Sequence, residues 1–183
     1  MKIKIIIPYF GAFPPYFALF LRSCAINSEV EFHIFTDQSA LPLCPQNVVV
    51  HELPFSALRA LMQKKLGLRD KALRALTPYK LCDCKPAYGV IFEDHLQDAD
   101  FWGFCDVDLI FGRIFDLLSM EEVQKSERVL TQGHLTLYRN SPRMNRLFEQ
   151  PLAGGIAFRR AIEIAEPCFF DEIFMPAICR AQG

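Results

Sequence analysis

The sequence lacks an apolar run of membrane-spanning length and an excess of basic residues. The net charge is −1, with 20 Lys and Arg against 21 Asp and Glu, so there is no stripe of cations for a nucleic-acid backbone. The apolar start of the chain resembles a signal peptide, but Pro8, Gly11 and Pro14 interrupt it and no cleavage site follows. We therefore expect no transmembrane segment, no nucleic-acid partner, and a location in the cytoplasm or at the inner face of the membrane.

The seven cysteines lack the paired spacings of a zinc site or a disulfide framework. Cys82 and Cys84 are two positions apart, but no second close pair accompanies them. We expect reduced, buried thiols. Internal repeats, low-complexity tracts and interdomain linkers are also missing, which predicts a single domain over residues 1–183. A hydrophobic share of 51% and an aromatic share of 13% allow a substantial core and exclude disorder.

The patterns along the chain predict an α/β domain. Strands are expected at residues 2–7, 31–36, 48–51, the aromatic run before Asp106, 128–130 and 134–138. Helices are expected at residues 15–27, 79–83, 87–96, 114–118 and 121–126, and a further helix should begin at the N-cap Ser56 and end at Gly67. Lys85-Pro86 should break the helical segment around it, and the basic stretch at 69–74 should be solvated. Because strands alternate with helices, the sheet is predicted to be mostly parallel and flanked by helices.

Asp106 and Asp108 form the most informative motif, since they stand one residue apart in an apolar segment. In extended backbone the two side chains would project to the same side at the carboxyl end of a buried strand. Two like charges in apolar surroundings need a compensating cation. A hard divalent ion such as Mn²⁺ or Mg²⁺ would serve and would keep sites for phosphates and water. The alternative is a turn at a strand end, where Asp is common.

Other polar groups follow the ends of predicted strands, where parallel sheets bind their ligands. Pro8 and Tyr9 follow the first strand, and Asp37 follows the second. Asp37 would either cap its loop or contact a nucleobase or ribose. Because these polar groups all follow strand ends, they support a ligand site at Asp106 and Asp108 more strongly than the Asp-x-Asp motif does by itself.

The segment that begins at Tyr79 places Lys80 and Asp83 three residues apart on one helical face, with Lys85 nearby. Lys80 and Asp83 could form a surface ion pair, which would contribute little to stability. Alternatively, the lysine could contact a diphosphate while the aspartate orients it or a sugar hydroxyl. Further along, His134 is either a structural histidine or a site residue. The strand it begins ends at Arg139 and Asn140, which could hold a phosphate or an acceptor, and Asp171 and Glu172 form the last acidic pair.

At this point the sequence resembles the GT-A type of glycosyltransferases, which are single-domain α/β enzymes of Rossmann-like fold that use nucleotide sugars and an Asp-x-Asp metal motif. More closely, it is similar to a bacterial family of glycosyltransferase-like proteins classed as a domain of unknown function. The resemblance is carried by IIIPYFG (5–11), YKLCDCKPAYG (79–89), DFWGFCDVDLIFG (100–112) and GHLTLYRN (133–140), with FTD (35–37) and FDE (170–172) as weaker pieces. Proteins of this type normally continue past the FDE segment, so the resemblance implies that a C-terminal part is missing.

The resemblance implies transfer of a sugar from a UDP- or GDP-linked donor to a saccharide or lipid-linked acceptor, as in surface polysaccharide biosynthesis. It assigns a nucleotide pocket (Pro8, Tyr9, Asp37), a donor sugar or diphosphate site (Tyr79, Lys80, Asp83, Lys85), the metal motif (Asp106, Asp108) and an acceptor side (His134, Arg139, Asn140, Asp171, Glu172). Asp171 or Glu172 would be a general base if the reaction inverts stereochemistry. Two other hypotheses are a catalytically inactive nucleotide-sugar-binding domain and a metal-dependent phosphohydrolase or nucleotidyltransferase.

Overall fold

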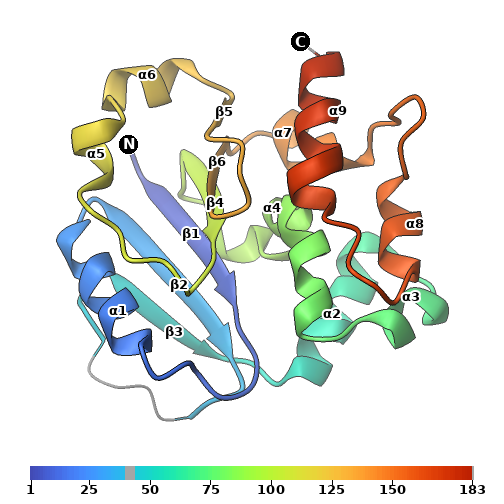
Figure 1. Cartoon of the computed structure of the whole chain (residues 1–183), viewed down its shortest axis with the longest axis horizontal. Helices are drawn as coiled ribbons and strands as arrows, with labels where there is room; N and C mark the ends of the chain where they lie inside the picture. The colour runs from blue at the N-terminus through green and yellow to red at the C-terminus, as the bar shows by residue number, and fades with distance from the viewer. Residues whose placement is uncertain (40–43, 183) are drawn as a thin grey trace.

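The computed structural model describes residues 1–39 and 44–182. Its six-stranded sheet has the order β3-β2-β1-β4-β6-β5 (Figure 1). The strands are β1 (Ile3–Pro8), β2 (Val30–Thr36), β3 (Val48–Glu52), β4 (Phe101–Cys105), β5 (Arg128–Val129) and β6 (Leu135–Arg139). β3, β2, β1 and β4 are parallel, whereas β6 pairs antiparallel with β4 and with β5. The α/β prediction is confirmed, but the sheet is mixed.

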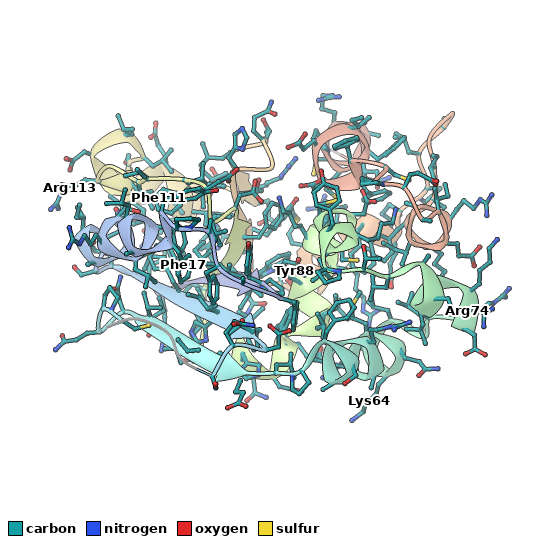
Figure 2. All side chains as sticks on the ribbon, turned by 60° about the horizontal axis from the view of Figure 1, so that its bottom comes forward. Phe17, Lys64, Arg74, Tyr88, Phe111 and Arg113 are labelled. Carbon is teal, nitrogen blue, oxygen red and sulfur yellow. The ribbon has the colours of Figure 1, made fainter. Side chains whose placement is uncertain are left out.

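One face of the sheet is covered by α1 (Phe17–Ile26) and by the segment that follows β4. Alternate residues of β1 point to this face, and Ile3, Ile5 and Ile7 pack there against Phe17 and Phe20. Two short helices, α5 (Ile114–Leu117) and α6 (Met120–Lys125), continue this layer. In Figure 2 the labelled Phe17 and Phe111 lie together on this side of the molecule.

The opposite face supports a larger helical layer, which lies to the right of the sheet in Figure 1. This layer carries a second hydrophobic cluster, in which Trp102 stacks on Tyr138 with ring centroids 4.8 Å apart. It contains η1 (Tyr79–Ala87, a 3-10 helix), η2 (Glu93–His95), η3 (Leu147–Glu149), η4 (Phe170–Phe174, a π-helix), and the helices α2 (Phe55–Leu66), α3 (Asp70–Ala75), α4 (Tyr88–Ile91), α7 (Pro142–Asn145), α8 (Phe158–Glu163) and α9 (Met175–Gln182).

Three local predictions were wrong in detail. Ser56 lies inside α2, whose N-cap is Pro54, although Gly67 does end that helix in the left-handed conformation. The charged residues of the basic stretch at 69–74 are exposed, as predicted, but most of the stretch forms α3, a helix that was not predicted, and it buries Ala72. Finally, η1 runs through Lys85 and Pro86 without a break and leads into α4.

Within the described parts of the chain, no helix combines the length and the apolar character needed to span a membrane.

Candidate functional site

A cleft of about 600 Å³ opens where β1 and β4 end at their carboxyl termini. Its walls come from stretches that are distant in sequence: the ends of β1 and β4, the segment before α1, η1 with the start of α4, and the residues around the start of η4. The predicted site residues that line it are Pro8, Tyr9, Tyr79, Lys85, Asp106, Asp108, Asp171 and Glu172. The fold therefore brings together most of the residues that the sequence pattern selected.

Asp106 and Asp108 both line the cleft, just past the end of β4. Asp106 follows Cys105 directly, and Asp108 lies with Val107 in the bend that comes next. Val107 between them is buried in the cluster on the α1 side. Asp106 is partly buried and Asp108 is exposed. The buried Val107 therefore holds in place the short segment that carries both aspartates.

Lys85 is the cation nearest to Asp106. Its Nζ donates to Asp106 Oδ1 at 2.7 Å and to the carbonyl oxygen of Gly133 at 3.1 Å, and it lies 3.3 Å from Asp171 Oδ2. Burial acts to lower the pKa of Lys85, but the carboxylates of Asp171 and Asp106 outweigh this effect and raise that pKa. Lys85 therefore remains an ammonium group between two carboxylates.

Asp171 and Glu172 enter the cleft from η4 in different states. Asp171 is buried, and loss of solvation raises its pKa to about 6 although Lys85 opposes the shift. Glu172 is exposed. Both side chains lie close to Gly133, where a Cβ atom would meet Glu172 Oε1 and Asp171 Oδ2. The acidic pair and the 133–134 loop are therefore packed directly against each other.

His134 follows Gly133 and stands at the edge of the same group. Its Nδ1 lies 3.7 Å from Asp106 Oδ2, and its side chain is 70% exposed. Its carbonyl oxygen accepts from the backbone N–H of Asp106 at 3.2 Å. His134 thus contacts the acidic motif through both its backbone and its ring.

On the nucleotide side, Pro8 and Tyr9 line the cleft but Asp37 does not. Asp37 Oδ1 accepts from the backbone N–H of Gly11 at 2.9 Å, and this hydrogen bond holds the pKa of Asp37 below its usual value. Gly11 has φ of 92°, so Asp37 supports a turn that favours glycine. The geometry favours the loop-cap interpretation of Asp37.

Lys80 and Asp83 do not line the cleft. They are 1% and 0% exposed and form an ion pair at 2.6 Å. Asp83 also accepts from the backbone N–H groups of Cys168 and Phe170, and Lys80 donates to the carbonyl oxygen of Glu166. This buried pair holds the chain before η4 in place, and neither side chain is exposed to the cleft.

Arg139 and Asn140 lie at the opposite edge of the sheet. Because β6 is antiparallel to β4, Arg139 pairs with Phe101 at the start of β4, far along the strand from Cys105. Arg139 contacts Glu127, and Asn140 Nδ2 donates to the carbonyl oxygens of Leu96 and Ala99. The antiparallel direction of β6 thus places Arg139 and Asn140 outside the cleft, which does not support the acceptor-side role that the resemblance implied.

Sequence reasoning missed six aromatic or thiol residues of the cleft wall: Phe10, Tyr16, Cys82, Tyr88, Cys105 and Phe169. Phe169 is the most unusual, because it has φ of 53° and directly precedes the π-helix η4. Left-handed non-glycine residues and π-helices are both frequent at functional sites. In the sequence, the adjacent aromatic residues Phe169 and Phe170 before Asp171 were the feature that could have indicated this part of the cleft wall.

The residues present fit a hard divalent ion. Asp106 and Asp108 offer carboxylate oxygens, the ligands that Mg²⁺ and Mn²⁺ prefer. In the described residues no third His, Cys, Asp or Glu joins them in a tight ligand set. An ion held there would complete its shell with water and phosphate oxygens, as magnesium usually does.

Comparison with models of protein families places the chain in a family without a known function. A family model described as "Family of unknown function (DUF6625)" matches residues 5–183. No curated protein and no solved structure matches the chain.

Proposed function

The chain belongs to the family of unknown function DUF6625, and we propose that it is a metal-dependent glycosyltransferase. The reaction would transfer a sugar from a nucleoside diphosphate donor to a saccharide or lipid-linked acceptor. The observation that carries the proposal is the convergence of Asp106, Asp108 and Lys85 in one cleft at the carboxyl ends of parallel strands. Ligands of open α/β sheets bind at this edge.

Asp106 and Asp108 would hold Mn²⁺ or Mg²⁺, which supplies Lewis-acid stabilisation of a diphosphate leaving group. Lys85 adds a fixed ammonium charge at the same place. Its Nζ lies beside Asp106 and Asp171 at the wall of the cleft, so its positive charge would act on a phosphate group bound there. Two positive charges, that of the bound ion and that of Lys85, would therefore stabilise the negative charge of the diphosphate.

Aromatic side chains around the mouth of the cleft support binding of a base and a sugar. Tyr79 is 73% exposed, and Tyr16 and Phe169 are each 47% exposed. Tyr9 stacks on Phe13 with ring centroids 4.9 Å apart, which leaves its ring orientation fixed. Flat faces of this kind stack on nucleobases and on the apolar faces of sugars.

Asp171 is the group best suited to take a proton from an acceptor hydroxyl. A general base works best when its pKa lies near the working pH, and burial raises the pKa of Asp171 to about 6. Glu172 is the exposed neighbour and could hold or orient the acceptor.

A thermal-shift screen with UDP- and GDP-sugars, with and without Mn²⁺, tests the proposal. A donor at 100 times its Kd should stabilise the protein by about 2.7 kcal/mol, and this shift should require Mn²⁺. Asp108→Asn should abolish it, whereas Asp116→Asn, an exposed aspartate on α5, should not. An equal shift in Asp108→Asn would refute the metal motif.

Turnover separates the remaining hypotheses. Release of UDP or GDP that requires both Mn²⁺ and an acceptor supports a transferase. Donor binding without release would indicate a binding domain, and phosphate release without an acceptor would indicate a phosphohydrolase.

A further inference from the structure

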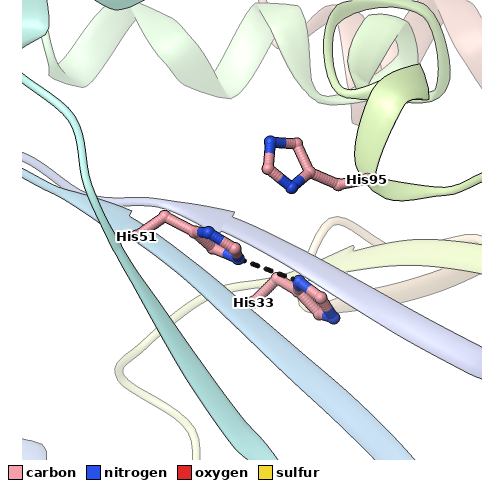
Figure 3. A group of neighbouring side chains, drawn as sticks. All are labelled: His33, His51 and His95. Carbon is pink, nitrogen blue, oxygen red and sulfur yellow. Dashed lines mark hydrogen bonds between the residues drawn. The ribbon is translucent and has the colours of Figure 1, made fainter.

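Three of the four histidines lie together on the face of the sheet that is turned away from α1 (Figure 3). His33 is in β2, His51 is in β3, and His95 ends η2. The parallel register pairs Phe35 with His51, so His33 and His51 point to the same face. One ring nitrogen from each of the three lies within 4.8 Å of the others. None of them lines the cleft.

The two strand histidines already share a short contact. His33 Nδ1 lies 3.0 Å from His51 Nε2, and the other ring nitrogen of His33, Nε2, lies 3.2 Å from Glu31 Oε2. When His33 Nε2–H donates to Glu31, Nδ1 carries a lone pair that faces the cluster. A carboxylate that accepts from the outer nitrogen of a histidine is the arrangement that orients metal-ligating histidines.

The spacing of the nitrogens suits a tetrahedral ion. With zinc–nitrogen bonds of about 2.0–2.1 Å, neighbouring ligand nitrogens are about 3.3 Å apart. The contact between His33 and His51 is close to this value, and His95 would need to approach by roughly 1.5 Å at most from the 4.8 Å limit. On metal binding the proton on His51 Nε2 would move to Nδ1 of the same ring. Each imidazole would then stay neutral, and no proton would be taken up or released.

Packing holds the rings of the cluster in place, and the nearest cation is paired with carboxylates. The ring of Phe35 stacks on His51 at 4.4 Å and meets His95 edge-on at 5.0 Å, which limits the positions of both imidazoles. Lys4 is the nearest cation, and its charge is offset by Asp98 at 2.5 Å and Glu31 at 3.8 Å. His51 and His95 are only partly buried, so an ion has a route from solvent.

We propose that His33, His51 and His95 form a second divalent-metal site, with zinc as the ion that fits best and water as its fourth ligand. Glu31 is the positioning residue for His33. Imidazole ligands favour zinc and related transition metals over the oxygen-preferring ions proposed for the cleft. The ion would tie β2, β3 and η2 together, and the proposal does not depend on the glycosyltransferase assignment.

The charge state of the rings agrees with this site. Burial lowers the pKa of His51 to about 4 and also lowers the pKa of His33 and His95. Near pH 7 the three rings are therefore neutral and have lone pairs available for an ion.

Zinc titration of the chelator-treated full chain by calorimetry, under reducing conditions, tests the site. We expect one tight equivalent of zinc. Glu31→Gln should weaken binding by about 10–100-fold, and His51→Gln and His95→Gln should each weaken it further. Glu121→Gln, at an exposed position on α6 outside both sites, is the matched control and should leave this zinc affinity unchanged. Circular dichroism checks that each variant folds. If a histidine variant does not fold, the zinc affinity of Glu31→Gln still tests the site.

Cobalt substitution identifies the ligands. Tetrahedral nitrogen coordination should give visible ligand-field bands without a thiolate-to-metal charge-transfer band. Absence of tight zinc binding in the unmodified chain, unchanged affinity in both histidine variants, or a thiolate band would each overturn the proposal, because the last two place the metal elsewhere.

Discussion

Two buried lysines of η1, Lys80 and Lys85, show how single residues five positions apart can serve different purposes. Lys80 faces the interior and pairs with Asp83, which also holds two backbone N–H groups of the 168–170 segment. Lys85 faces the cleft and contacts two carboxylates there. The first ion pair is a structural connection, and the second belongs to the candidate site.

Asp83→Asn should destabilise the fold strongly. It leaves the ammonium of Lys80 buried without its counter-charge, and breaking a buried pair in this way costs about 3–5 kcal/mol. Urea unfolding at pH 7 measures the change. The matched control is Lys125→Ala, which removes an exposed pair with Glu121 and should change stability by less than about 1 kcal/mol. Equal small effects in both variants would contradict the assignment.

At the scale of elements, the decisive contact is between β4 and β6. Their antiparallel pairing takes Arg139 away from the cleft and brings the 133–134 loop to it. Gly103 in β4 permits this pairing, because a Cβ atom there would collide with the carbonyl oxygen of Thr136 and the side chain of Leu137. Strand glycines commonly mark such close approaches.

Gly103→Ala should therefore separate β4 from β6 and destabilise the protein by about 1–3 kcal/mol, the usual cost of overpacking a buried site. Gly112→Ala is the control, since nothing lies within 4 Å of its added Cβ and its backbone is unstrained. Its stability should change by less than about 0.5 kcal/mol. Chemical denaturation of both variants provides the comparison, and a tolerated Gly103→Ala would argue against the pairing.

At the scale of the whole molecule, one sheet separates two hydrophobic clusters. Ile5 of β1 belongs to the cluster on the α1 side, and its neighbour Ile6 belongs to the other. Because the same strands serve both clusters, neither can lose its order without disturbing the sheet. The single domain expected from the sequence therefore predicts one cooperative unfolding transition.

Phe20→Ala tests this coupling across the sheet. Phe20 is 0% exposed on the α1 side, whereas Trp102, the single tryptophan, is buried in the other cluster. The substitution should cost about 3–5 kcal/mol and should move Trp102 fluorescence and far-UV circular dichroism to the same lower midpoint. Leu117→Ala, at an 87% exposed position, should leave both midpoints in place. A shift in dichroism alone would indicate two independent units.

The sequence by itself determined the α/β class, the positions of most strands, and the acidic motif with its neighbours Tyr9 and Lys85. These depend on local signals, such as the apolar run of β1 stopped by Pro8 and the polar residues that follow strands. Such signals show in the chain because side-chain periodicity and chain-breaking residues act over only a few positions.

The tertiary structure alone decided the direction of β6, the burial of Lys80 and Asp83, and the meeting of His33, His51 and His95. Each depends on contacts between residues distant in sequence. Spacing along one segment cannot show whether a lysine faces a cleft or an interior, because that depends on what packs against it. For the same reason three histidines separated by 18 and 44 positions carry no local pattern, and only the folded sheet and η2 bring their rings together.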